Sequence, residues 1–148
     1  MGITDVIRVT NDDERQAAFA IREAVFVDEQ GVDQPLEFDG LDDESDHLLA
    51  KLDGRPVGTL RLRWVDDASA KIERVAVLRG ARGRAVGAAL MKVALDLLRE
   101  RGARSVKLHA QTHALDFYEK LGFAAHGDVF DEDGLPHRAM HLAFEPSR

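Results

Sequence analysis

Residues 73–91 constrain the fold of this chain more than any other stretch, because they combine the signals of a strand, a basic turn and a helix. Residues 71–78 are rich in β-branched and apolar side chains, which is typical of a strand. Residues 79–84 hold two glycines and three arginines, and apolar side chains then recur at helical spacing at Val86, Leu90, Val93, Leu97 and Leu98. A helix start leaves about four backbone N–H groups unpaired and carries a partial positive charge. The segment therefore predicts a strand and a helix joined by a turn that receives phosphate oxygens.

The glycine pattern of this turn excludes two common nucleotide loops. It lacks the GxxxxGK[ST] pattern of nucleotide triphosphatases, and its glycines do not have the GxGxxG spacing of dinucleotide folds. Residues 82–87, with the sequence RGRAVG, instead resemble the acetyl-CoA pyrophosphate loop of the GNAT superfamily of N-acetyltransferases, [R/Q]-x-x-G-x-[G/A]. The departure is Ala85, where the family usually has glycine, and we expect a helix start to give alanine acceptable torsions. Taken alone, the turn fits equally well an ordinary exposed basic turn before a helix.

The composition is that of one soluble globular domain covering residues 1–148. A net charge of −7 argues against general nucleic-acid binding. No apolar run approaches the length of a membrane span, and the first residues lack a signal-peptide core, so we expect a cytoplasmic protein without a membrane partner. The absence of cysteine excludes disulfides, thiolate metal ligands and a cysteine nucleophile.

Other local patterns place the remaining elements. Asn11 followed by Glu14 is a capping-box-like helix start, and Asp-Gly at residues 53–54 between two alternating segments predicts a β-hairpin. The strand–helix–strand order of residues 71–110 implies a right-handed parallel crossover with a ligand crevice at the carboxyl end of its first strand. The predicted helices are residues 11–26, 84–101 and 113–121, and the predicted strands are residues 3–10, 47–52, 57–65, 71–78, 105–110, 123–126 and 137–144.

Residues 27–47 carry nine acidic side chains and no lysine or arginine. A long loop of this kind inside a compact domain is usually functional or disordered. One interpretation is an acidic wall that attracts a cationic amine, centred on Glu37, Asp39, Asp42 and Asp43. The other is a solvated loop, which fits most of these acids individually.

A second motif strengthens the resemblance to the GNAT superfamily. Residues 114–123, ALDFYEKLGF, closely match the family signature A-x-x-F-Y-x-K-x-G-F, and residues 26–30, the acidic stretch and residues 133–137 look like the ElaA-like branch. The resemblance covers nearly the whole chain. It implies an α+β GNAT fold, a mixed and mostly antiparallel twisted sheet of six to seven strands, with helices on both faces and a splayed central strand pair.

The resemblance also implies a reaction, the transfer of an acetyl group from acetyl-CoA to a primary amine by direct attack. The strand backbone would pair with the pantetheine arm and polarise the thioester carbonyl, and the turn would hold the pyrophosphate. The cofactor-binding residues are then Val75, Ala76, Val77, Arg82, Gly83, Arg84, Ala85, Val86 and Gly87. Tyr118 is the family's usual general acid, because a phenol pKa near 10 suits donation to a thiolate. Its alternative role is to continue the apolar face of its helix.

Glu73 is the first candidate for the general base, because some family members keep a catalytic glutamate at its position. The alternatives are His47, His109, His113 and His137. Candidates for acceptor binding are Glu29, His109, Gln111 and His137. We predict no metal site, since His137 and His141 lie about 13 Å apart on a strand, too far for one ion.

These patterns favour an N-acetyltransferase. The alternative is a non-catalytic acyl-CoA-binding regulatory module, which would make the same phosphate contacts without needing Tyr118 or a base. The sequence leaves the acceptor open among polyamines, amino sugars, small amines and protein N-termini. It also leaves open whether the chain works as a monomer or a homodimer.

Overall fold

The structure, a computed structural model, describes residues 4–144. The sheet has seven strands in the order β1 (Thr4–Arg8), β2 (Asp46–Leu52), β3 (Arg55–Trp64), β4 (Ser69–Val77), β5 (Ser105–Gln111), β7 (Leu135–Ala143) and β6 (Ala124–Glu132). Neighbouring strands are antiparallel except β4 and β5. The predicted mixed, mostly antiparallel sheet is confirmed, although Ile3, where the first strand was expected to begin, lies outside the described residues.

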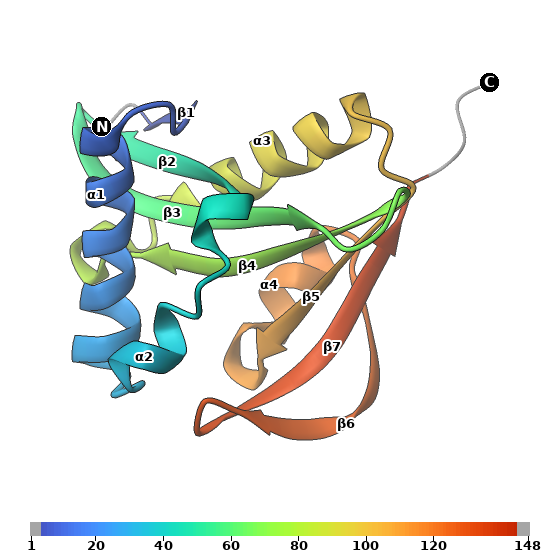
Figure 1. Cartoon of the computed structure of the whole chain (residues 1–148). Helices are drawn as coiled ribbons and strands as arrows, with labels where there is room; N and C mark the ends of the chain where they lie inside the picture. Colours follow the sequence, from blue (N-terminus) through green and yellow to red (C-terminus); the bar gives the residue numbers. More distant parts are fainter. Residues whose placement is uncertain (1–3, 145–148) are drawn as a thin grey trace.

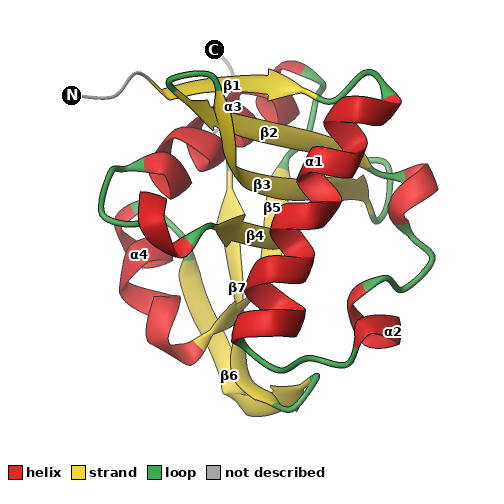
Figure 2. Ribbon diagram, turned by 90° about the vertical axis from the view of Figure 1, so that its left-hand side faces the viewer, coloured by secondary structure: helices red, strands yellow, loops and turns green. Residues whose placement is uncertain are grey.

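Helices cover both faces of the sheet, as predicted (Figures 1 and 2). One face carries α1 (Asp12–Arg22), its π-helical continuation η1 (Glu23–Glu29), α2 (Gln34–Glu37) and the short turn η2 (Asp42–Glu44). The other carries α3 (Val86–Glu100) and α4 (Leu115–Lys120), which follow the short turns η3 (Arg79–Ala81) and η4 (Thr112–Ala114). The Asn11 side chain accepts a hydrogen bond from the Glu14 N–H at 2.9 Å, so the predicted cap is confirmed.

The core consists of two clusters of buried apolar side chains, one on each side of the sheet. The larger lies under α3 and α4, and the smaller lies under α1 and η1. Gly58 on β3 lets α3 approach closely, because a Cβ at this position would lie 2.9 Å from Val86 and 3.0 Å from Leu90. This contact brings the first turn of α3 close to the carboxyl end of β4, which Gly58 pairs with through Val77.

β4 and β5 form the central fork of the sheet. They pair in parallel only from Ser69–Lys71 to Ser105–Lys107, and then diverge (Figure 1). The β3–β4 register shifts between Thr59 and Arg61, where β4 holds one extra residue and Arg74 takes a φ of 57°. A bulge of this kind bends its strand and increases the local twist. The predicted splayed central pair is thus present, and the fork, residues 72–77 of β4 facing 108–111 of β5, is open to a ligand.

Candidate active site

The fork borders a cavity of about 880 Å³. Its lining brings together residues from both ends of the chain that the sequence had singled out. They are Glu73 and Tyr118, the acceptor candidates Glu29, His109, Gln111 and His137, and the strand residues Val75, Ala76 and Val77. A second hollow of about 270 Å³ shares Val77 and Arg82 with it, and is lined by Gly83, Ala85, Val86, Gly87 and Phe117. Of the proposed cofactor residues, only Arg84 lines neither space, and its side chain is exposed.

The edge of β4 that faces the fork has no strand partner. Beyond Lys71, β4 pairs with β3 on one side and with no residue of β5 on the other. Unpaired backbone groups along a strand edge offer hydrogen bonds to an extended molecule. Residues 75–77 therefore present the kind of edge that an amide-containing chain can pair with.

The turn before α3 differs from expectation at Ala85. Its φ and ψ are 61° and 22°, so it is left-handed rather than helical, and α3 begins at Val86 instead of residue 84. The expectation that alanine has acceptable torsions here is therefore wrong. The physical reason is that Ala85 precedes the helix instead of belonging to it, in a conformation that costs an L-residue roughly 1–2 kcal/mol. Gly83 also has a left-handed φ, of 79°, but glycine adopts this conformation without steric cost.

Arg82 is bound by an acidic residue from η1. Its guanidinium makes a two-point ion pair with Glu29, with N–O distances of 2.6 and 2.7 Å, and also donates to the Val77 carbonyl at 3.0 Å. Arg79 lies 3.5 Å from the same carboxylate. The hydrogen bond from Arg82 lowers the pKa of Glu29 to about 2. Glu29, expected to contact the acceptor, thus contacts the cofactor loop.

Tyr118 projects from α4 into the cavity lining. The side chain is buried between Phe117 and Phe123, with ring centroids 5.0 and 6.1 Å away. Its hydroxyl has no hydrogen-bond partner among residues 4–144, which leaves it free to donate to a ligand. Burial raises the pKa of Tyr118 well above its usual value, so the hydroxyl stays protonated at neutral pH.

Glu73 is surrounded by three cations. Its carboxylate lies 3.1 Å from Arg61 and 3.6 Å from Lys71, and it also pairs with Arg63. Burial alone would raise the pKa of Glu73, but the hydrogen bond from Arg63 and the nearby positive charges hold it below its ordinary value. The carboxylate is therefore ionised, but it is a weak proton acceptor.

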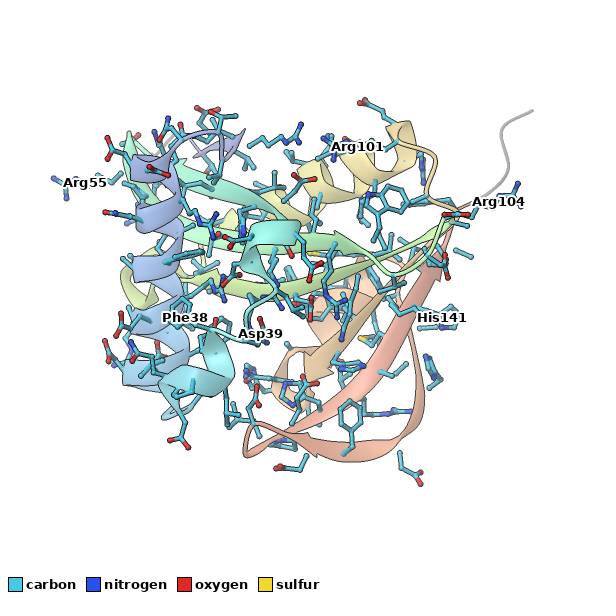
Figure 3. The ribbon with its side chains drawn as sticks, viewed as in Figure 1. Phe38, Asp39, Arg55, Arg101, Arg104 and His141 are labelled. Carbon is cyan, nitrogen blue, oxygen red and sulfur yellow. The ribbon has the colours of Figure 1, made fainter. Side chains whose placement is uncertain are left out.

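The acidic stretch is anchored to the sheet by buried arginines. Asp39 follows α2 and lies over the sheet (Figure 3), where it binds Arg61 at 2.9 Å and Arg74 at 3.2 Å. Asp42 lies 2.6 Å from Arg22 and 3.1 Å from Arg61. Arg22 and Arg61 are completely buried, so these pairs are well shielded from water.

The same arginines hold Glu37, which lies 2.7 Å from Arg22 and 3.2 Å from Arg74. Asp43 pairs with Arg15. The charges of all four acids chosen for the acidic wall are thus paired with arginines, so these acids do not form the unpaired acidic surface that was expected, and attraction of a cationic acceptor to this stretch stays a prediction. The sequence interpretation missed these ion pairs because the arginines come from α1, β3 and β4, outside the acidic stretch.

Histidine and glutamine side chains cover the opposite wall. His109 Nδ1 lies 2.8 Å from Glu132 Oε1, and His137 Nε2 lies 3.7 Å from Glu132 Oε2. Gln111 and Gln30 hydrogen bond to each other through both amides, at 2.9 and 3.4 Å, and so join η1 to β5. The sequence interpretation missed Glu132 because it predicted a strand of residues 123–126 only, whereas β6 runs from Ala124 to Glu132.

His113 lies 2.8 Å from Gln111 at the same wall. His47, in contrast, is buried against Phe19 and is not part of the cavity lining. Within the described range 4–144, no three His, Cys, Asp or Glu side chains are placed to hold a metal ion, and no helix is long and apolar enough to cross a membrane.

Comparison with known proteins agrees with this geometry. The Acetyltransferase (GNAT) family matches residues 10–123. The Bacillus subtilis protein YyaT is 37% identical over 92% of this chain and 93% of its own length, and Escherichia coli ElaA is 34% identical over 84% of each. The crystal structure of E. coli ElaA superposes with a TM-score of 0.82, covering 96% of this chain and 99% of ElaA. The crystal structure of an acyl-CoA N-acyltransferase from Pseudomonas aeruginosa is 32% identical in sequence. It superposes with a TM-score of 0.83, covering 95% of this chain and 100% of that one. The chain belongs to the GNAT family of acetyltransferases.

Proposed function

We propose that residues 1–148 form a single acetyltransferase domain that moves an acetyl group from acetyl-CoA to a primary amine by direct attack. The observation that carries this proposal is the fork. An unpaired strand edge and a free tyrosine hydroxyl border the larger cavity, and a loop at a helix start borders the smaller hollow, which shares Val77 and Arg82 with that cavity. These are the groups needed to hold an amide arm, a pyrophosphate and a leaving sulfur.

The loop residues Arg82–Gly87 fit the pyrophosphate. Five of the six line the smaller hollow, and the N–H groups of the first turn of α3 face outward from a helix start. At Gly87 a Cβ would lie 3.4 Å from the Phe117 ring, so larger side chains would fill this space. A GNAT acetyltransferase from Elizabethkingia anophelis, solved with acetyl-CoA bound, has the same fold with a TM-score of 0.73.

Residues 75–77 would pair with the pantetheine arm, and one of their N–H groups would polarise the acetyl carbonyl. Tyr118 would serve as the general acid, donating from its hydroxyl to the sulfur as the C–S bond breaks. Its buried position keeps this donor protonated over the neutral and moderately alkaline range. Loss of activity in that pH range would therefore come from a group other than Tyr118.

The test combines binding with turnover. Acetyl-CoA at about 100 times its Kd should stabilise the protein by roughly 2.7 kcal/mol, whereas ATP at the same concentration should not. Acetyl-CoA with a panel of spermidine, L-lysine, glucosamine and a short peptide N-terminus should release free thiol faster with an accepted amine than without one. Binding without thiol release from any amine would favour the regulatory module instead.

Two glycine variants locate the cofactor. Gly87→Leu should abolish the acetyl-CoA-induced rise in Tm, because the side chain fills the smaller hollow. Gly80→Leu is the matched control, since Gly80 has open space around it, no positive φ and no place in either lining. Equal acetyl-CoA stabilisation of two folded variants would place the pyrophosphate elsewhere.

A further inference from the structure

The contact between His109 and Glu132 fixes the proton on the imidazole. The hydrogen bond from His109 lowers the pKa of Glu132, so this carboxylate is ionised and can only accept hydrogen bonds. His109 Nδ1, 2.8 Å from Glu132 Oε1, must therefore carry the proton of the neutral ring. The lone pair is then on Nε2, which has no partner among residues 4–144.

The neighbouring His137 has the same tautomer for a different reason. Its Nδ1 lies 2.8 Å from the Leu135 carbonyl oxygen, which can only accept a hydrogen bond, so Nδ1 is protonated. Its Nε2 lies on the side of Glu132. The Phe130 ring contacts both imidazoles, edge-on to His109 at 5.0 Å and stacked on His137 at 6.1 Å, and so restricts their rotation.

His109 lies at the point where the fork opens. The last pair that joins β4 to β5 is Lys71 and Lys107, and Glu73 and His109 each lie two residues further along. Side chains two apart on a strand share a face, so Glu73 and His109 project from the same face of the sheet, on opposite sides of the fork. Three cations surround Glu73, whereas His109 keeps an unused lone pair.

We infer that His109 is the general base of the proposed acetyl transfer and that Glu132 is its positioning residue. In this step the lone pair of the amine forms the N–C bond to the acetyl carbon. His109 Nε2 takes the N–H proton that the nitrogen loses. The C–S bond breaks, its electron pair leaves on the CoA sulfur, and the sulfur takes the Tyr118 hydroxyl proton, which Tyr118 regains from solvent. The imidazolium is stabilised by Glu132 and returns its proton to solvent. This inference rests on the proposed function.

Several charged groups share the cavity with His109 and contribute to the pH dependence of this step. They are Glu132 from β6, His137 and Asp133 from the β6–β7 hairpin, Lys71 and Glu73 from β4, and His113 from η4. Glu132 is the only one of these bonded directly to the His109 ring within the described residues. Removing its charge therefore disfavours the imidazolium most directly.

The kinetic test uses the amine that gives the fastest thiol release in the panel above. His109→Ala should lower kcat by roughly 10²–10⁴ with an unchanged Kd for acetyl-CoA, and added imidazole should restore part of the rate. Glu132→Gln should lower kcat less, and should move the acidic fall of kcat/KM to lower pH. The control is His126→Ala, an exposed histidine outside the cavity. Unchanged kcat in His109→Ala, with loss of kcat in Glu73→Gln, would return the role to Glu73.

A spectroscopic test does not depend on any acceptor. Long-range ¹H–¹⁵N correlation spectra of the full chain at neutral pH should show His109 with the proton on Nδ1, and Glu132→Gln should shift the Nδ1 resonance. A ring with the proton on Nε2 would overturn the inference. The two proposals can fail separately, because a wild-type protein that neither binds acetyl-CoA nor releases thiol refutes the acetyltransferase, whereas an active His109→Ala variant refutes only the base.

Discussion

Replacing Ala85 with glycine should stabilise the protein, although this exchange usually destabilises a helical region. Ala85 has a φ of 61°, a left-handed conformation that costs an L-residue roughly 1–2 kcal/mol. Glycine does not incur this cost, but it loses roughly 0.5–1 kcal/mol more conformational entropy on folding. The difference is a net gain of roughly 0–1.5 kcal/mol, centred near 0.8. For a chain of this size 1 kcal/mol corresponds to about 2–4 °C, so Tm should rise by about 2–3 °C.

Urea unfolding and thermal melts of Ala85→Gly and Ala89→Gly measure this effect. Ala89 lies inside α3 with helical torsions, so glycine there should lower the unfolding free energy by roughly 0.5–1 kcal/mol. The two variants are expected to move in opposite directions. If both lower the urea midpoint equally, residue 85 is not left-handed and the account of this loop is wrong. Acetyl-CoA affinity should not fall, because glycine keeps the same backbone path.

Four further sets of substitutions have expected outcomes. Arg61→Met should lower the unfolding free energy by about 3–5 kcal/mol, because it removes the fully buried guanidinium that Asp39, Asp42 and Glu73 share. Arg15→Met, which loses an exposed pair, should cost less than about 1 kcal/mol in urea unfolding. Burial would raise the pKa of Asp39, but the arginines lower it overall. The pairing of Asp39 therefore stabilises the fold above about pH 4, and this stabilisation is lost as the pH falls further. The urea midpoints of Asp39→Asn and wild type should converge in acid. Tyr118→Phe should lower kcat by roughly 10²–10⁴ with unchanged acetyl-CoA affinity, and wild-type turnover would assign the proton to water. Glu29→Gln removes the charge that pairs with Arg79 and Arg82. It should tighten acetyl-CoA binding by less than about tenfold, measured by calorimetry at low salt. Weaker binding would mean that the carboxylate instead holds the loop in its binding conformation.

Elements with strong local periodicity were predictable from the sequence. The strand before the basic turn, the helix after it and the Asp-Gly hairpin all appear close to their expected positions. Each depends on side chains within a few residues of one another, so spacing alone identifies it. The π-helical segment that extends to Glu29 was not predicted, because apolar spacing indicates a helix without distinguishing a π turn from an α turn.

The active-site chemistry was harder to predict, because it depends on contacts between distant segments. Arg61 and Asp39 lie far apart in sequence, and neither reveals its partner, so the acidic stretch looked like an unpaired charged surface. The role of Glu132 depends on the β6–β7 register and on His109 across another strand. The left-handed torsion of Ala85 was not predicted either, because alanine rarely adopts it and the residue type gives no sign of it.

The fork also divides the sheet into two parts. Within the plane of the sheet, the four strands before α3 and the three strands after it are joined by only three residue pairs. An extended molecule that hydrogen bonds to both open strand edges would join the two parts of the sheet through additional backbone hydrogen bonds. Filling the fork should therefore make unfolding more cooperative as well as raise its midpoint, which slower hydrogen exchange at residues 72–77 and 108–111 would reveal.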